Sequence, residues 1–143
     1  MGNRAVIAFE SESLQQTLNE VGLYLHWNGG LESIEGFCKA ADELEIGEKA
    51  RFIQMVANWF GGQLSVYVDQ VRKLDHDNHD NGTYVLSKAS GNWKVAKRYF
   101  YTPEMTLKDA SSINGATPAE WAEYPVTPKL EIVPNEQLYI VFP

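Results

Sequence analysis

The pattern of hydrophobic and polar residues at the start of the chain predicts two strands separated by a polar segment. Residues 4–9 are mostly apolar without strict alternation, which is typical of a strand covered on both faces. Residues 21–27 form a second β-prone run, closed by the turn signal Asn28-Gly29-Gly30. The polar residues 10–20 between them indicate a loop or a weak helical turn.

Two amphipathic helices are predicted after the glycine turn. In the first, over residues 32–44, apolar residues recur at spacings of three and four, namely Ile34, Phe37, Cys38, Ala41 and Leu44. The second helix, over residues 48–60, has an apolar face formed by Ala50, Ile53, Ala57 and Phe60 and flanked by Phe52, Val56 and Trp59. Gly61-Gly62 ends this helix.

The second half of the chain returns to strand patterns. Residues 64–68 alternate with period two, and residues 83–86 and 93–96 supply two further strands joined by a turn at 90–92. These three strands are predicted to form an antiparallel meander.

The tail from Tyr101 is cut into short pieces by five of the six prolines. A capping box begins at Thr117 with proline at the first helical position, and predicts a short helix to about Glu123. Residues 138–142 are predicted to be a terminal strand. We therefore expect one domain over residues 1–143 with an α+β fold, in which the two consecutive helices pack on a mainly antiparallel sheet.

Composition and charge restrict the functional classes. The 143 residues carry a formal net charge of -7, which argues against nucleic-acid binding because that needs clustered Lys and Arg. No apolar run is long enough to span a bilayer, and no secretory leader is recognisable, so we expect no membrane association. Cys38 is the only cysteine and lies on an apolar helix face, which fits a buried thiol in a reducing cytoplasm.

The densest group of potential metal ligands is the loop around residues 75–82. It contains Asp75, His76, Asp77, His79 and Asp80, and closes with an Asn-Gly turn. An EF-hand reading fails because Lys88 falls where the bidentate glutamate belongs. Two readings stay open: a nonstandard divalent-cation site, and a hairpin connection whose polar side chains cap their own turns. We expect the second, and therefore no cofactor.

Two further groups are candidate binding surfaces. The first is a ligand site at the strand-to-helix turn, where aromatic and polar side chains meet free amides, and comprises His26, Trp27, Asn28, Gly29 and Gly30. The second is a partner-binding patch at Tyr99, Phe100 and Tyr101, which place aromatic rings on both sides of a strand. The aromatic surplus also predicts a homodimer or a small oligomer.

Four sequence blocks carry a resemblance to a group of small proteins encoded by bacteriophages, prophages and other bacterial mobile elements. The blocks are residues 3–7 (NRAVI), residues 25–30 (LHWNGG), residues 58–66 (NWFGGQLSV) and residues 74–84 (LDHDNHDNGTY). The likeness covers about residues 3–98, and the proline-rich tail 101–143 lies outside it. Leu31-Glu32 stand where relatives tend to carry Arg-Asp after the glycine turn, which weakens an anion-site reading.

The resemblance implies an accessory protein that acts in the cytoplasm of a bacterial host by binding. We therefore expect a non-enzymatic protein that binds a host protein or sequesters a small ligand, with inhibition of a bacterial defence system as one form of this role. The alternative is a hydrolase or nuclease that depends on a divalent metal held by residues 75–80. An enzyme needs carboxylates converging on an open cation, whereas a binder needs an exposed aromatic surface.

Overall fold

A computed structural model describes residues 2–60, 65–76, 78–101, 106–110 and 123–125, with side chains described as far as Tyr99 except at Phe60. The elements in chain order are β1 (Ala5–Phe9), α1 (Leu14–Asn19), β2 (Val21–Leu25), α2 (Leu31–Glu43), α3 (Lys49–Phe60), β3 (Val66–Gln70), the 3-10 helix η2 (Val71–Lys73), β4 (Thr83–Ala89), β5 (Asn92–Tyr101), β6 (Thr106–Ala110) and β7 (Glu123–Pro125).

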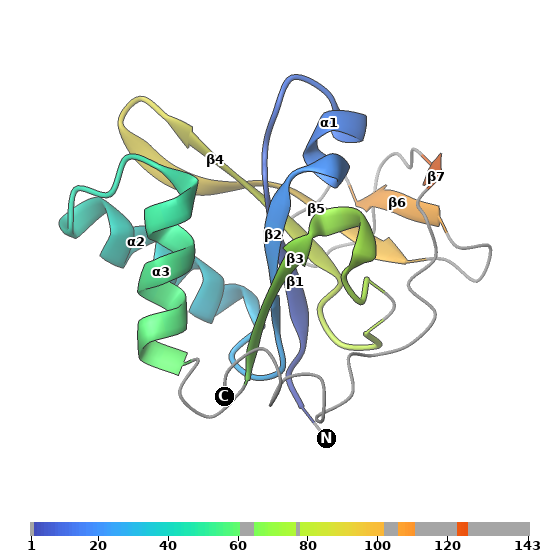
Figure 1. Ribbon diagram of the computed structural model, residues 1–143, viewed down its shortest axis with the longest axis horizontal. Coiled ribbons are helices and arrows are strands. Elements are labelled where there is room, and N and C mark those ends of the chain that lie inside the picture. Colours follow the sequence, from blue (N-terminus) through green and yellow to red (C-terminus); the bar gives the residue numbers. More distant parts are fainter. Residues whose placement is uncertain (1, 61–64, 77, 102–105, 111–122, 126–143) are drawn as a thin grey trace.

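One mixed sheet organises the molecule (Figure 1). Its strand order is β3-β2-β1-β4-β5-β6-β7, and five of the six pairings are antiparallel. The exception is the parallel pair of β1 and β4, which aligns Val6 with Thr83 and Phe9 with Leu86. The predicted α+β class with a mainly antiparallel sheet is therefore confirmed.

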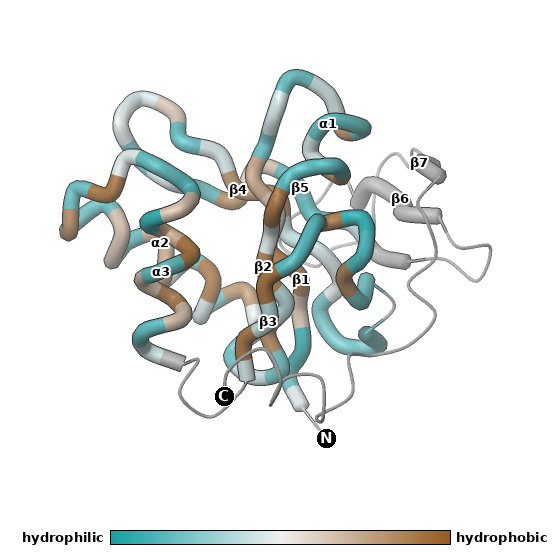
Figure 2. The backbone as a smooth tube through the Cα atoms, viewed as in Figure 1, coloured by the Kyte–Doolittle hydropathy of each residue, from teal (hydrophilic) through white to brown (hydrophobic). Residues whose placement is uncertain are grey.

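The central strand β1 is buried along its whole length because both of its faces are covered. Ala5, Ile7 and Phe9 point to the side of α2 and α3, where they join the largest core cluster. On the other side Ala8 packs with residues of α1, η2, β4 and β5. In Figure 2 the central strands accordingly carry much of the brown colour of apolar residues.

The structure corrects the predicted meander. β3 and β4 follow each other in the sequence, yet β3 is an edge strand paired with β2, whereas β4 lies on the far side of β1. The polar segment 10–20 contains a helix, α1, whose N-cap Ser13 accepts a hydrogen bond from the amide of Gln16 at 3.1 Å. In the tail, Glu123 begins β7, so the predicted helix does not reach this residue; residues 117–122 and 138–142 lie outside the described residues.

The two long helices form where the periodicity predicts them, but the predicted buried face of each helix needs correction. On α2, Ile34, Phe37, Cys38 and Ala41 are buried as expected, while Leu44 directly after the helix is 57% exposed. On α3 the buried residues are Phe52, Met55 and Val56, whereas Ala50 is exposed and Ile53 and Ala57 are half-buried.

The buried face of α3 is rotated relative to the predicted one, because the apolar residues of this helix occupy more than one stripe along its surface. Phe52 takes the central place, with its ring 5.5 Å from Phe9 and 5.0 Å from Trp93, centroid to centroid. Trp59 lies one turn beyond Met55 and two beyond Phe52, on the same side of the helix, and yet is 55% exposed. The core therefore covers this stripe only along part of α3.

We predict that Phe52→Ala lowers the free energy of unfolding by about 3–5 kcal/mol, because it removes a fully buried ring that contacts two other aromatic residues. Trp59→Ala, on the same stripe, is expected to change it by less than about 0.5 kcal/mol. Urea unfolding of both variants measures this contrast. Equal losses in the two variants would contradict an α3 that turns Phe52 into the core and leaves Trp59 outside it.

Candidate functional site

The blocks that carry the sequence resemblance meet at the start of β1. The amide of Asn3 donates to the His26 carbonyl at 2.9 Å, and the amide of Gly29 donates back to the Asn3 carbonyl at 2.7 Å. The His26 amide donates to the Ser65 carbonyl at 2.8 Å. From the loop after η2, Asn81 donates through its backbone amide to the Arg4 carbonyl at 3.1 Å. Segments distant in sequence are thus held together at one end of the sheet.

The predicted ligand turn presents one exposed aromatic ring beside a histidine. Trp27 is 48% exposed, and its indole meets the His26 ring edge to face at 5.1 Å between centroids. The Tyr24 hydroxyl lies 3.2 Å from His26 Nδ1. Burial raises the pKa of Tyr24 above its ordinary value, and the nearby Asp75 carboxylate raises it further, so the phenol stays neutral. The turn offers a polar and aromatic rim without an activated nucleophile among these residues.

Two backbone features fix this turn. Asn28 has φ 64, in the left-handed region that asparagine tolerates better than most residues. Gly29 is buried, and a Cβ at this position would lie 2.5 Å from the Asn3 carbonyl oxygen. Gly30 then precedes the first residue of α2 without a side-chain cap. Gly29 therefore has a structural reason to be glycine, whereas a Cβ at Gly30 would make only an ordinary contact, 3.5 Å from Asn3 Nδ2.

The loop of residues 75–82 is organised by Asn78, which is fully buried. Its Oδ1 accepts hydrogen bonds from the amides of Asp80, Asn81 and Gly82 at 3.1, 3.2 and 3.1 Å. Its Nδ2 donates to the carbonyls of Asp75 and Gly82 at 3.0 and 3.1 Å. The sequence predicts that polar side chains of this loop cap its turns; an asparagine does so because a carboxamide both donates and accepts hydrogen bonds, whereas a carboxylate only accepts.

His76 and Asp80 of this loop also have partners inside the protein. His76 is buried, with Nδ1 2.6 Å from Thr83 Oγ1 and Nε2 2.7 Å from the Val71 carbonyl oxygen. The Asp80 carboxylate pairs with Arg4 Nε at 2.7 Å, which lowers its pKa. Asp75 is buried, His79 is exposed, and Asp77 lies outside the described residues. Within the described part of the chain, no group of three His, Cys, Asp or Glu is placed to hold a metal ion.

Tyr99 and Cys38 are both buried. Tyr99, predicted to belong to a partner-binding patch, is 1% exposed and packs in the core against Ala8, Leu18 and Val85. That prediction is wrong for Tyr99, because its ring fills the space between β5 and α1. The side chains of Phe100 and Tyr101 lie outside the described residues. Cys38 is buried, which raises the pKa of its thiol to about 12 and leaves it protonated.

Sequence reasoning missed a groove along α3. Its hollow of about 310 Å³ is lined by Leu44, Ile46, Arg51, Gln54, Met55, Asn58 and Trp59. The buried side chains of Ile46 and Met55 form its floor, while Leu44 and Trp59 are more than half exposed. The signal in the sequence was Trp59 itself, which the helical pattern assigned to the flank of a buried face. We call this surface the α3 groove.

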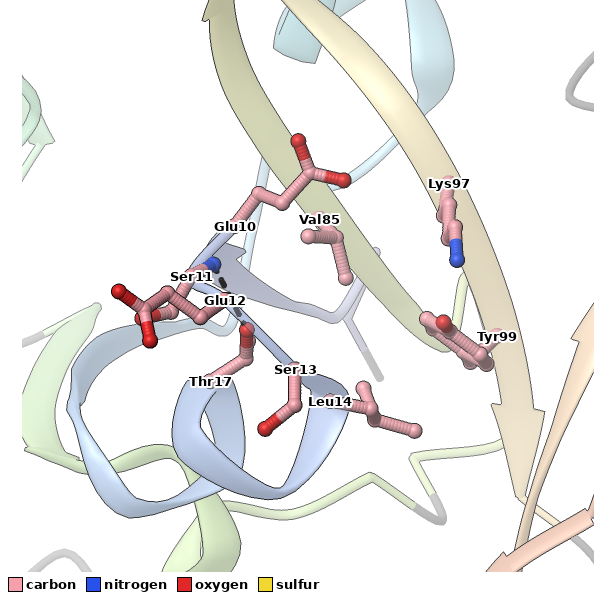
Figure 3. A pocket seen from close by; sticks show the side chains of 9 residues that line it. All are labelled: Glu10, Ser11, Glu12, Ser13, Leu14, Thr17, Val85, Lys97 and Tyr99. Atoms are coloured by element: carbon pink, nitrogen blue, oxygen red, sulfur yellow. Dashed lines mark hydrogen bonds between the residues drawn. The ribbon is translucent and has the colours of Figure 1, made fainter.

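A second, smaller hollow lies between the β1–α1 connection and β5 (Figure 3). Its volume is about 110 Å³, and it is lined by Glu10, Ser11, Glu12, Ser13, Leu14, Thr17, Val85, Lys97 and Tyr99. No local sequence pattern indicates this hollow, because residues 10–14 and residue 97 come together only through the pairing of β1, β4 and β5. We call it the β1–α1 hollow.

We predict that stability falls as the pH drops from 6.5 toward 4, because burial lowers the pKa of His76 from 6.5 to about 4. In this window the unfolded chain binds a proton that the folded protein excludes, so the full contribution, about 3 kcal/mol, is present above pH 6.5 and is lost by about pH 4. Urea unfolding at a series of pH values measures this slope. His76→Gln should flatten it, and the exposed His79→Gln should not; equal slopes in all three proteins would contradict the assignment.

We also predict that Ca²⁺, Mg²⁺ or Mn²⁺ leaves the melting temperature unchanged, because Asn78 organises the loop without an ion. Asn78→Ala should instead cost about 1–3 kcal/mol, since the amides of Asp80 and Gly82 lose their acceptor and the Asn81 amide keeps only the Arg4 carbonyl. The opposite result would be a stabilisation of roughly 2.7 kcal/mol at a cation concentration 100 times its dissociation constant. If Asp77→Asn abolished that stabilisation, the loop would be a metal site.

Comparison with known proteins supplies no function. Models of protein families, curated proteins and solved structures were compared with the chain, and none of them matches it. Among the described residues, no helix is both long enough and apolar enough to cross a membrane. The chemistry of the described surfaces is therefore the basis on which a function can be proposed.

Proposed function

We propose that the protein is a non-enzymatic binding protein that holds a partner protein in the α3 groove. The observation that carries this proposal is the exposure of Leu44 (57%) and Trp59 (55%) around a hollow of about 310 Å³ with an apolar floor. Burial of apolar surface in a complex is favourable by about 25 cal/mol for each Å² removed from water, and these two side chains leave more than half of their surface in water. Two such side chains beside one hollow are what a docking surface provides.

The composition of the groove fits a protein interface better than an active site. Trp, Arg and Met are enriched at interfaces, and Trp and Arg are the residues whose truncation most often costs binding energy. Arg51, Gln54 and Asn58 add hydrogen-bond donors and acceptors beside the apolar residues, as a polar rim does. The groove contains no histidine, cysteine or carboxylate among its lining residues, so it offers no acid or base for catalysis.

The charges around the groove indicate a basic partner. Glu43 and Glu45 flank Leu44 in the sequence, Glu48 precedes α3, and all three are exposed. None of them forms an ion pair with any residue that the structure describes. Arg51 is the single cation of the lining, and the whole chain carries a net charge of -7. The complementary occupant is a segment with apolar side chains flanked by Lys or Arg, whose approach the acidic rim would accelerate at low salt.

The resemblance to phage and mobile-element proteins gives this proposal a setting. The partner would be a protein of a bacterial host, bound in the cytoplasm, and blocking a defence system is one consequence of occupying such a surface. A second copy of this chain is the competing occupant. Light scattering separates the two, because a monomer of 16.1 kDa at micromolar concentration leaves the groove open to another protein.

We predict that a bacterial lysate passed over the immobilised protein leaves one host protein bound in stoichiometric amount, and that Trp59→Ala releases it. Removing a central tryptophan is expected to weaken binding by at least about 2 kcal/mol, or roughly 30-fold. Replacing Glu43 and Glu45 with glutamine should weaken it further at low salt and have little effect at high salt. Calorimetry with the purified partner gives both values.

Trp27→Ala is the matched control, because Trp27 is a tryptophan of similar exposure (48%) outside the groove. It should retain the partner fully. Loss of the partner with Trp27→Ala but not with Trp59→Ala would move the interface to the start of β1 and contradict the proposal. Binding unchanged by both substitutions, or an acidic bound segment, would contradict it as well.

A further inference from the structure

The β1–α1 hollow brings together two opposite charges that have no partner in the described structure. Glu10 continues β1, and its amide donates to the Leu86 carbonyl at 2.8 Å. Lys97 lies opposite Val85 in the β4–β5 register. Neither side chain forms a hydrogen bond or an ion pair with any residue that the structure describes, and both line the same hollow. In Figure 3 the Glu10 carboxylate and the Lys97 side chain stand on opposite sides of Val85.

One strand separates the backbones that carry these two charges. β4 lies between β1 and β5 in the strand order. Neighbouring strands are about 4.8 Å apart, so the backbones that carry Glu10 and Lys97 are separated by roughly 10 Å. The space between the two charged groups is bounded below by the apolar side chains of Leu14 and Val85 and by Tyr99. The hollow thus has an apolar floor with a carboxylate on one side and an ammonium on the other.

The connection that forms one wall is held in place. The Ser11 amide donates to Thr17 Oγ1 at 3.0 Å, and the Ser11 hydroxyl donates to Glu20 at 3.3 Å. The Thr17 amide donates to the Ser13 carbonyl at 3.0 Å. Thr17 and Tyr99, on the inner side of the hollow, are 2% and 1% exposed. A ligand would therefore meet a preformed wall and would not have to order it, which reduces the entropic cost of binding.

We propose that the β1–α1 hollow binds a small zwitterion, with Lys97 contacting its anionic group and Glu10 its ammonium group. A simple anion is attracted by Lys97 but repelled by Glu10 and Glu12, and a simple cation is attracted by the carboxylates but repelled by Lys97, whereas a molecule with both charges can be attracted at each end. The size of the hollow limits the ligand. A cavity of about 150 Å³ accommodates benzene, so about 110 Å³ accommodates a molecule of roughly five or six non-hydrogen atoms. Short amino acids have this size and charge pattern.

The test is an NMR titration of the full-length protein with β-alanine as the probe. Propionate and ethylammonium, which carry one of its two charges each, serve as comparison ligands. Saturable shifts of the amide signals of residues 10–14, 85, 97 and 99 are expected with β-alanine, and much weaker ones with either single-charge compound. No saturable shift at millimolar β-alanine, or equal shifts with a single-charge compound, would overturn the proposal.

Substitutions then locate the contacts. Lys97→Met and Glu10→Gln should each weaken β-alanine binding roughly five-fold, the scale of one exposed charge pair. Both residues are exposed, so circular dichroism should show an unchanged fold. Lys94→Met is the matched control, because Lys94 is an exposed lysine of the same strand that does not line the hollow. If Lys94→Met weakens binding as much as Lys97→Met, the effect is one of net charge and the site assignment is wrong.

Discussion

The burial of β1 on both faces is the constraint on which the rest of the structure depends. A strand of five apolar residues must be covered from two sides and paired along two edges, because its amides and carbonyls have no access to water. β2 and β4 satisfy its edges, the helices α2 and α3 cover one face, and α1 covers the other. The groove and the hollow border this arrangement, but the residues chosen for substitution there, Trp59, Glu10 and Lys97, are exposed, so their variants can be tested without dismantling the core.

The loop after η2 supports the same core although its sequence is polar, because its buried side chains form hydrogen bonds within the protein. Its His76 is buried between the Val71 carbonyl and the Thr83 hydroxyl, and therefore joins the start of η2 to the start of β4. Since β4 is the parallel neighbour of β1, the loop must cross from one side of β1 to the other, and Asn78 holds its turn by five hydrogen bonds. In a loop whose sequence resembles a metal site, the side chains of His76, Asn78 and Asp80 thus have structural roles.

Local sequence patterns predicted the helices and strands well, but they predicted the order of the strands in the sheet less well. The two long helices and the strands from β1 to β5 follow from periodicity, because a helix or a strand is decided within a few residues. The position of β4 beside β1 does not follow, since it depends on contacts between residues more than seventy positions apart, such as Val6 and Thr83. The β1–α1 hollow depends on the same pairing, so no short motif could have indicated it. The ligand turn at residues 26–30 was recognisable because all of its residues are contiguous.

The orientation of α3 explains why Trp59 is informative. Apolar residues cover more than half of this helix, so periodicity alone allows several orientations, and only the position of β1 and Trp93 selects Phe52 for the core. Once that choice is made, Trp59 is on the side that faces the core but beyond the part that is covered, with 55% of its surface exposed. A lysine or glutamine at this position would expose less apolar surface to water. Trp59 therefore gains less from burial than Phe52 does, which is why the proposed docking surface is tested at this residue.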